Sequence, residues 1–173
     1  MICKGKDTEK EVEDNRFSDR NLKEYFKRCF FAVDGLWFVS TEENMGFEKA
    51  LELDRQVWAI LPKIQARKIR ELLSLTGRTS EDLRTALEFK FKAEEYGYQA
   101  ASADGELEFR LTDCPWLKLL RQSGREDLAP LIGKTICGIE YAVWAKEFGV
   151  RYHNNLEDRL CIDGKFCLLR FTG

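Results

Sequence analysis

Hydrophobic residues in the first half of the chain recur at spacings of three and four, which is the period of an α-helix. A first row covers residues 22–33, and Gly46 is a predicted stop for this helix. A second helical pattern covers residues 47–75. Because Pro62 lacks a backbone N–H, we expect this second helix to bend or break near residues 58–61.

A third helix is predicted over residues 81–96, with Thr79 as a capping residue at its start. The period then changes from 3.6 to 2. Apolar and polar residues alternate over residues 107–112, which predicts a strand with one buried face. Residues 98–103 pair with this strand across a two-residue turn at Asp104-Gly105, a dipeptide typical of tight hairpins.

The last part of the chain predicts two more helices and a second hairpin. A short helix follows Pro115, and another covers residues 134–148. The hairpin joins residues 152–162 to residues 165–172 through a turn at 163–164. Two hairpins combine into one antiparallel sheet covered by helices, so the predicted fold class is α+β.

The predicted organisation is a disordered arm over residues 1–18 followed by a single α+β domain over residues 19–173. Residues 19–97 form a helical part of this domain, and residues 98–173 form a part that holds most of the cysteines. A chain of 173 residues is long enough to bury a core without disulfide or metal staples.

Composition and charge exclude several functional classes. Hydrophobic residues make up 44% of the chain, and its net charge is only −2 with both signs mixed. A nucleic-acid-binding protein usually shows a basic excess, so no nucleic-acid partner is expected. No membrane partner is expected either, since the sequence has no apolar run long enough for a span and no signal-peptide pattern. We expect a cytoplasmic protein, in which the six cysteines are free thiols, metal ligands or catalytic groups.

Cys114 is the candidate nucleophile. It directly precedes Pro115, and proline favours the first position of a helix, so Cys114 is expected at or beside the helix N-cap. The positive end of the helix dipole would lower the pKa of a thiol there and favour the thiolate. The alternative interpretation is a small residue tolerated at a cap.

One face of the helix over residues 134–148 combines Cys137 and Glu140 with the aromatic residues Tyr141 and Trp144. The aromatic residues either belong to the core or line a pocket, together with Trp116. Glu140 is unusual, because a carboxylate on an apolar face is costly unless it is paired, exposed at the edge, or bound to a metal.

Three cysteines and a carboxylate form a candidate zinc set. Thiolates are suitable zinc ligands and four donors close a tetrahedral site, so Cys137, Cys161 and Cys167 with Glu140 or Glu157 are candidates. A two-residue turn at 163–164 would place Cys161 and Cys167 on opposite faces of the sheet, and only a longer turn or a bulge brings them together.

The chain resembles an uncharacterised prokaryotic family that is itself similar to the L-2-amino-thiazoline-4-carboxylate hydrolase family. The resemblance rests on several segments: Val33–Phe38, Pro62–Arg67, Cys114-Pro115-Trp116, Ser123–Glu126, Ile136–Tyr141 and Gly164–Phe171. It implies a fold and, less directly, a hydrolase acting on a thiazoline-like or amide small molecule.

The closing Cys-x-x-Arg-Phe pattern at Cys167–Phe171 is also similar to the 4-vinyl reductase domain, which binds small molecules. Some domains of that family hold zinc with three cysteines and one glutamate. The resemblance implies Cys137, Glu157, Cys161 and Cys167 as the corresponding ligands.

Three functions follow as hypotheses. The first is a small-molecule-binding or sensory module whose pocket is lined by Trp116, Tyr141 and Trp144, with a structural zinc ion beside it. The second is a hydrolase that uses Cys114 or a metal-bound water. The third is an interaction protein or scaffold that forms a homodimer through the apolar faces of the first two helices, near Trp37 and Phe38.

Overall fold

The computed structural model describes residues 17–154 and 159–173. The first helical row forms α1 (Asp19–Met45), which begins at an N-cap where the Ser18 hydroxyl accepts a hydrogen bond from the Asn21 amide at 3.3 Å. The arm expected over residues 1–18 lies outside the described residues apart from its last two, and Ser18 belongs to the helix cap. Gly46, with a φ of 86°, ends α1, which confirms the predicted stop.

The expected break in the second helical segment is also confirmed. It separates α2 (Phe47–Trp58) from α3 (Leu61–Leu72), and Pro62 lies in the first turn of α3, where its missing N–H costs nothing. The third predicted helix is α4 (Ser80–Glu94). The Thr79 hydroxyl accepts a hydrogen bond from the Asp82 amide at 3.1 Å, as expected of an N-cap.

The first hairpin forms as predicted, from β1 (Gly97–Ala103) and β2 (Glu106–Asp113). Asp104 and Gly105 connect the strands with φ values of 52° and 80°. Positive φ at both central residues is the mark of the turn that matches the natural twist of a hairpin.

Two helices follow, α5 (Pro115–Gln122) and α6 (Ala129–Glu147), with a 3-10 turn η2 (Glu126–Leu128) between them. The sequence prediction started the second helix at residue 134, five residues after its true start. Pro130 lies in the first turn of α6 and begins the helix instead of preceding it.

The second hairpin forms, but its strands and its turn differ from the prediction. Only β3 (Arg151–Asn154) and β4 (Cys167–Thr172) pair, with Asn154 opposite Leu169, so the connection is long and no tight turn forms at 163–164. A 3-10 helix η3 (Leu160–Ile162) replaces the expected end of the third strand. The alternation of apolar and polar residues does not reveal the 3-10 helix, because a single turn of such a helix is too short to interrupt the pattern.

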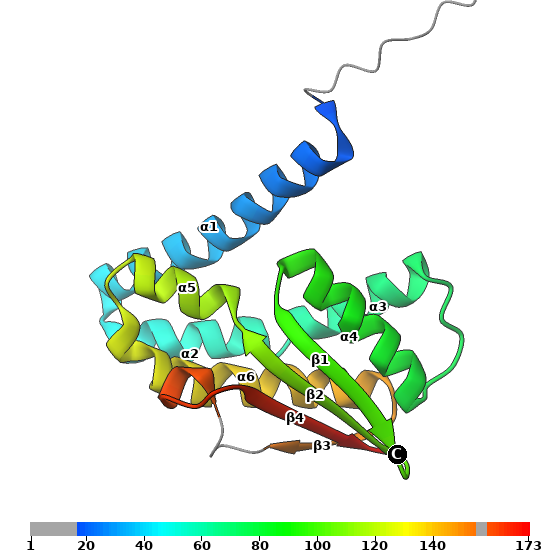
Figure 1. Ribbon diagram of the computed structural model, residues 1–173. Coiled ribbons are helices and arrows are strands. Elements are labelled where there is room, and N and C mark those ends of the chain that lie inside the picture. The colour runs from blue at the N-terminus through cyan, green and yellow to red at the C-terminus, as the bar shows by residue number, and fades with distance from the viewer. Residues whose placement is uncertain (1–16, 155–158) are drawn as a thin grey trace, which may run out of the picture.

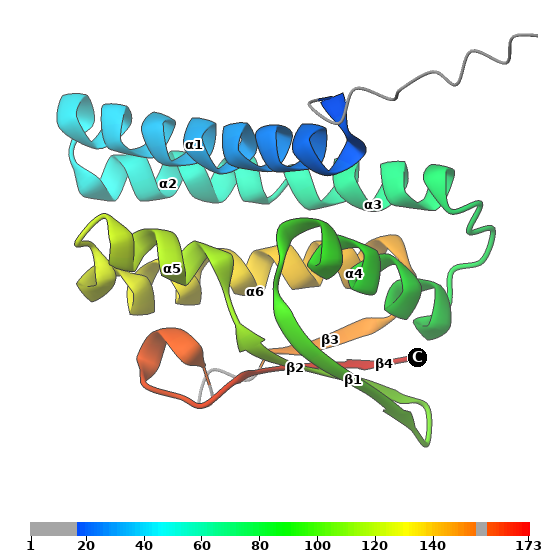
Figure 2. The same ribbon diagram turned by 45° about the horizontal axis from the view of Figure 1, so that its top comes forward.

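The strands form one antiparallel sheet in the order β1-β2-β4-β3, and the helices cover one of its faces (Figures 1 and 2). Leu107, Phe109 and Phe171 point into the core from that face, whereas Arg110 and Arg170 are exposed on the other face. The central core joins α3, α4 and α6 to the sheet. This arrangement confirms the α+β fold class. No helix within the described part of the chain is both long and apolar enough to cross a membrane.

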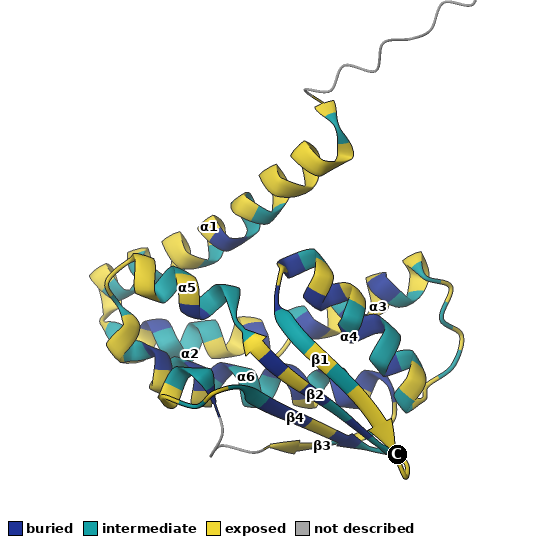
Figure 3. Ribbon diagram, in the orientation of Figure 1, coloured by how far each residue is buried: buried dark blue, intermediate teal, exposed yellow. Residues whose placement is uncertain are grey.

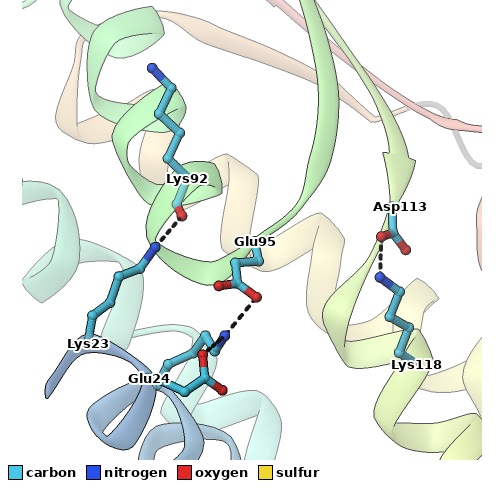
Figure 4. A network of polar contacts seen from close by, with 7 residues as sticks. Lys23, Glu24, Lys92, Glu95, Asp113 and Lys118 are labelled. Atoms are coloured by element: carbon cyan, nitrogen blue, oxygen red, sulfur yellow. Dashed lines mark hydrogen bonds and ion pairs between the residues drawn. The ribbon is translucent and has the colours of Figure 1, made fainter. Parts of the chain in front are cut away.

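The long helix α1 lies over α2 and continues past it toward the end of α4 (Figures 1 and 2). A polar network fixes it there: the Lys27 ammonium lies 2.6 Å from Glu95 and 2.5 Å from Glu24, and Lys23 donates to the Lys92 carbonyl oxygen at 3.1 Å (Figure 4). Most of the outer surface of α1 is exposed (Figure 3). The inner surface faces the candidate site.

Candidate functional site

A cavity of about 420 Å³ lies between the α1–α2 pair and the α5–α6 pair. It extends to η3 and the start of β4, and its walls are largely apolar. Cavities of roughly 300–1,000 Å³ with apolar walls and a few polar groups are typical of small-molecule sites. Ala32, Gly35, Leu36 and Ser123 line the cavity and are also exposed, so the cavity reaches the surface between α1 and α5.

An aromatic cluster forms one wall. The Trp116 ring makes edge-to-face contacts with Phe31 at 4.5 Å and with Trp58 at 5.4 Å between centroids. These rings come from α5, α1 and α2, so the cluster joins three helices around the cavity. Such pairs add about 0.5–1.5 kcal/mol each beyond the area they bury. The indole nitrogen of Trp116 is buried and has no hydrogen-bond partner within the described chain.

Two of the three aromatic residues that the sequence suggested for a pocket line this cavity. They are Trp116 and Tyr141. Trp144 does not line it: the side chain is fully buried and stacks on Phe148 at 6.3 Å between ring centroids. Trp144 therefore belongs to the core, which was the alternative interpretation of the apolar stripe on α6.

Asp34 and Asp54 are the site residues that the sequence analysis missed. They come from α1 and α2 and both line the cavity beside Trp58. Burial raises the pKa of Asp34 to about 6, and a hydrogen-bonding contact with Trp58 lowers it only in part. Burial, reinforced by the neighbouring Asp34 charge, raises the pKa of Asp54 to about 7. Within the described residues, no lysine, arginine or histidine nitrogen lies within 4.0 Å of either carboxylate.

A sequence signal for these aspartates was present. Asp34 occupies the same helical face as Phe31 and Phe38, and Asp54 lies four residues before Trp58. A carboxylate inside an apolar helical row is the anomaly that singled out Glu140, and the same argument applies to both aspartates.

Arg125 lies at the other side of the cavity mouth, and its charge is compensated. The guanidinium lies 2.6 Å from Glu42 of α1 and 5.7 Å from the centre of the Phe38 ring. This pair is partly buried, so it ties the loop after α5 to α1 across the entrance.

Glu140 is paired by a buried lysine, which is one of the three outcomes expected for it. The Lys90 ammonium lies 2.9 Å from Glu140 and 2.7 Å from Glu94, and all three residues are buried. Burial opposes the charge of Lys90, but the two carboxylates outweigh it and raise the pKa of the lysine. For Glu140 the balance is reversed: burial raises the pKa despite Lys90. The Glu140 Oε1 atom lies close to the Lys90 ammonium but without the geometry of a hydrogen bond. The contact between the two residues is therefore mainly an ion pair.

Cys114 is the N-cap of α5 and Pro115 is its first residue, as predicted. The backbone amides of Leu117 and Trp116 favour the thiolate, yet burial dominates and raises the pKa of the Cys114 thiol to about 12. A thiol with this pKa is protonated at neutral pH. Burial therefore weighs against a nucleophilic role, which stays a prediction.

Cys137, Cys161 and Cys167 line the same cavity as Cys114. Cys167 accepts a hydrogen bond from the Leu160 amide at 3.3 Å, and Cys161 packs against Gly133, where an added Cβ would come within 2.7 Å of its sulfur. The long connection before β4 thus brings Cys161 and Cys167 to one end of the cavity. Burial raises the pKa of all three thiols.

These thiols do not form a metal site in the arrangement described. Within residues 17–154 and 159–173, no three side chains of the histidine, cysteine, aspartate or glutamate type gather as a metal would require. Glu157 lies outside the described residues. The expected zinc site therefore rests on resemblance and stays a prediction. The His153 ring of β3 is exposed and lies 2.8 Å from the Thr172 hydroxyl of β4, and His153 does not line the cavity.

Residues 18–162 match the model of a family of unknown function, DUF6125, and the chain belongs to this family. The match spans all the helices and the first three strands, so it covers the cavity except for its β4 wall. No curated protein and no solved structure matches the chain.

Proposed function

We propose that this protein binds a small, largely apolar molecule in the cavity between α1–α2 and α5–α6. The observation that carries the proposal is the cavity itself, about 420 Å³ in volume, with aromatic walls and a route to the surface. Protein interiors are close-packed, and a void of this size sacrifices contacts that a folded chain normally makes. A ligand restores these contacts.

Reversible binding suits the site better than catalysis. A hydrolase needs an activated nucleophile or a metal-bound water, and burial keeps the thiol of Cys114 protonated. The similarity of the Cys167–Phe171 segment to the 4-vinyl reductase domain agrees with a small-molecule-binding or sensory module. Zinc on Cys137, Cys161 and Cys167 would require these side chains to move together, and metal analysis of the purified protein tests that part separately.

A thermal-unfolding screen against small apolar compounds tests the proposal. A ligand at about 100 times its dissociation constant adds roughly 2.7 kcal/mol, which raises the Tm of a domain of this size by roughly 5–10 °C. Ala32→Trp should abolish the shift, because residue 32 lines the cavity mouth. Ala142→Trp is the matched control, since Ala142 is exposed on α6 and does not line the cavity. Equal shifts in the two variants would contradict binding in this cavity.

A second proposal concerns the outer face of α1. Phe26, Val33 and Trp37 are large apolar residues on this face, and Trp37 is 71% exposed. The opposite face of α1 already packs inward through Phe31. A helix that is apolar on both faces is normally covered on both. We propose that a second copy of the chain covers the outer face.

Charge along α1 favours an antiparallel pairing of two copies. Residues 19–31 contain four basic and two acidic residues, whereas residues 34–45 contain three acidic residues and no basic one. A two-fold axis across the helix would place the basic half of one copy beside the acidic half of the other.

Sedimentation velocity tests this dimer. The wild-type chain should sediment as a dimer at tens of micromolar, and Trp37→Glu should sediment as a monomer with unchanged helicity. Leu131→Glu is the control, since Leu131 is 48% exposed on α6 rather than α1. A monomeric wild-type chain would contradict the proposal.

A further inference from the structure

The two aspartates give the cavity a chemical preference that its apolar walls alone do not. They enter from different helices, α1 and α2, and lie beside the aromatic cluster instead of in solvent. Placing a carboxylate in such surroundings is costly unless a partner compensates it. The described residues provide only a contact with Trp58.

The other charged groups that line the cavity have partners of their own. Arg125 lies 2.6 Å from Glu42, and Glu140 lies 2.9 Å from Lys90. Arg159 donates to the Gly133 carbonyl oxygen at 2.9 Å and to Asn154 at 2.5 Å. The positive charge missing beside the aspartates is therefore not provided by the arginines of the cavity wall.

We propose that the ligand of this cavity is an apolar molecule with a protonated amine, and that Asp34 and Asp54 bind its ammonium group. This inference rests on the proposed function and specifies its ligand class. An ammonium donates hydrogen bonds to carboxylates, and charge-assisted bonds of this kind are about twice as strong as neutral ones. The faces of aromatic rings such as Trp58 and Trp116 also attract a cation. The apolar remainder of the ligand fills the space that extends toward α6 and β4.

A hard divalent cation is a weaker match for the same aspartates. Calcium takes six to eight oxygen ligands, and the walls here are largely apolar. An amine needs only the two carboxylates and tolerates apolar surroundings for its carbon skeleton.

The protonation state of the two aspartates makes binding of an ammonium depend on pH. The two carboxyls have pKa values of about 6 and about 7, so at pH 5.5 both are largely protonated and neutral. An ammonium binds a carboxylate better than a carboxylic acid, so affinity should increase as the pH rises from 5.5 to 8. The remaining ionisable groups on the cavity wall are Tyr96, Tyr141 and the four thiols. Burial raises their pKa values above this range.

Matched amine and alcohol probes test the inference by isothermal titration calorimetry. Suitable pairs are 2-(1-naphthyl)ethylamine with 2-(1-naphthyl)ethanol and 1-adamantylamine with 1-adamantanol, measured at pH 5.5 and pH 8. The amine should bind roughly tenfold to a hundredfold more tightly than its alcohol at pH 8, and the preference should shrink at pH 5.5.

Variants separate the ligand class from the existence of a site. Asp34→Asn and Asp54→Asn should each remove most of the preference for the amine and leave alcohol binding within about twofold. Glu48→Gln, an exposed carboxylate on α2, is the control and should retain the preference. Equal binding of amine and alcohol by the wild-type chain, unaffected by these variants, would overturn the amine inference and leave the proposed function intact. Failure of both pairs to bind would contradict the proposed function and the inference together.

Discussion

At the scale of single residues, the informative side chains are charged groups in apolar surroundings. Among the described residues, no cation lies within 4.0 Å of Asp34 or Asp54, whereas Glu140 and Glu94 share Lys90. The charges of Glu94 and Glu140 are thus compensated, whereas, within the described chain, those of Asp34 and Asp54 are not. An uncompensated charge beside a cavity reduces stability and is retained where a ligand uses it. Substitutions in the two pairs should therefore change the stability of the free protein in opposite directions.

Asp54 makes the free protein less stable as the pH rises. Its folded pKa of about 7 lies above its unfolded value of 3.8, so its contribution to stability is fully present below the unfolded value and is lost as the pH rises through about 7. Asp54→Asn should therefore be more stable than the wild type at pH 8, by about 1–2 kcal/mol after allowance for partial exposure, and the difference should narrow toward pH 4.

Urea unfolding at several pH values checks this, with Glu48→Gln as the control on the same helix. If Asp54→Asn and the wild type keep a constant difference from pH 4 to pH 8, Asp54 is not held in an environment that disfavours its charge.

Substitution of Lys90 should lower the stability of the protein, in contrast to Asp54→Asn. Lys90→Met leaves two buried carboxylates without their cation, which typically costs about 3–5 kcal/mol. Adding Glu94→Gln and Glu140→Gln to this variant should restore a large part of the loss, because the neutral amides no longer need a cation. Chemical denaturation measures both steps. A Lys90→Met chain as stable as the wild type would show that the ion pairs of Lys90 with Glu94 and Glu140 contribute nothing to stability.

At the scale of secondary structure, the sequence predicted most of the elements and failed where local pattern is ambiguous. Gly46, Pro62 and the Asp104-Gly105 turn were correctly placed, because each acts through its own backbone. The second hairpin forms with shorter strands and a longer connection than predicted, since β3 and η3 contact α6 and β4 pairs with β2 on its other side. The cavity could not be predicted either, because its walls come from elements far apart in the chain.

The position of α1 depends on a few polar contacts at its first half, and this gives an element-scale prediction. Lys27→Ala removes the ion pairs with Glu95 and Glu24, each worth at most about 1 kcal/mol because both carboxylates are largely exposed. Amide hydrogen exchange should quicken in the first half of α1 and remain unchanged in α6.

Lys68→Ala is the matched control, since within residues 17–154 and 159–173 Lys68 forms its ion pair with Glu71 on its own helix. Equal exchange of α1 in the wild type and Lys27→Ala would show that packing on α2 alone holds the helix.

At the scale of the whole molecule, the fold separates two tasks. The sheet with α3, α4 and α6 forms a continuous core, whereas α1, α2 and α5 close a cavity beside it. The elements around the cavity thus include α1, whose outer surface is largely exposed (Figure 3) and carries large apolar residues such as Trp37. If two copies pair through α1, ligand binding on its inner face and dimerisation on its outer face act on the same helix, and each would influence the other.

The measurement that tests the central claim most directly is an equilibrium titration with N-phenyl-1-naphthylamine, an apolar dye whose emission rises in dry surroundings. Trp58 and Trp116 line the cavity, so their emission should fall by energy transfer as the dye binds. We predict a saturable site of one dye per chain in the wild type and in the control Ala142→Trp, and its loss in Ala32→Trp. Dye binding that does not saturate, or that Ala32→Trp leaves unchanged, would contradict a ligand site in this cavity.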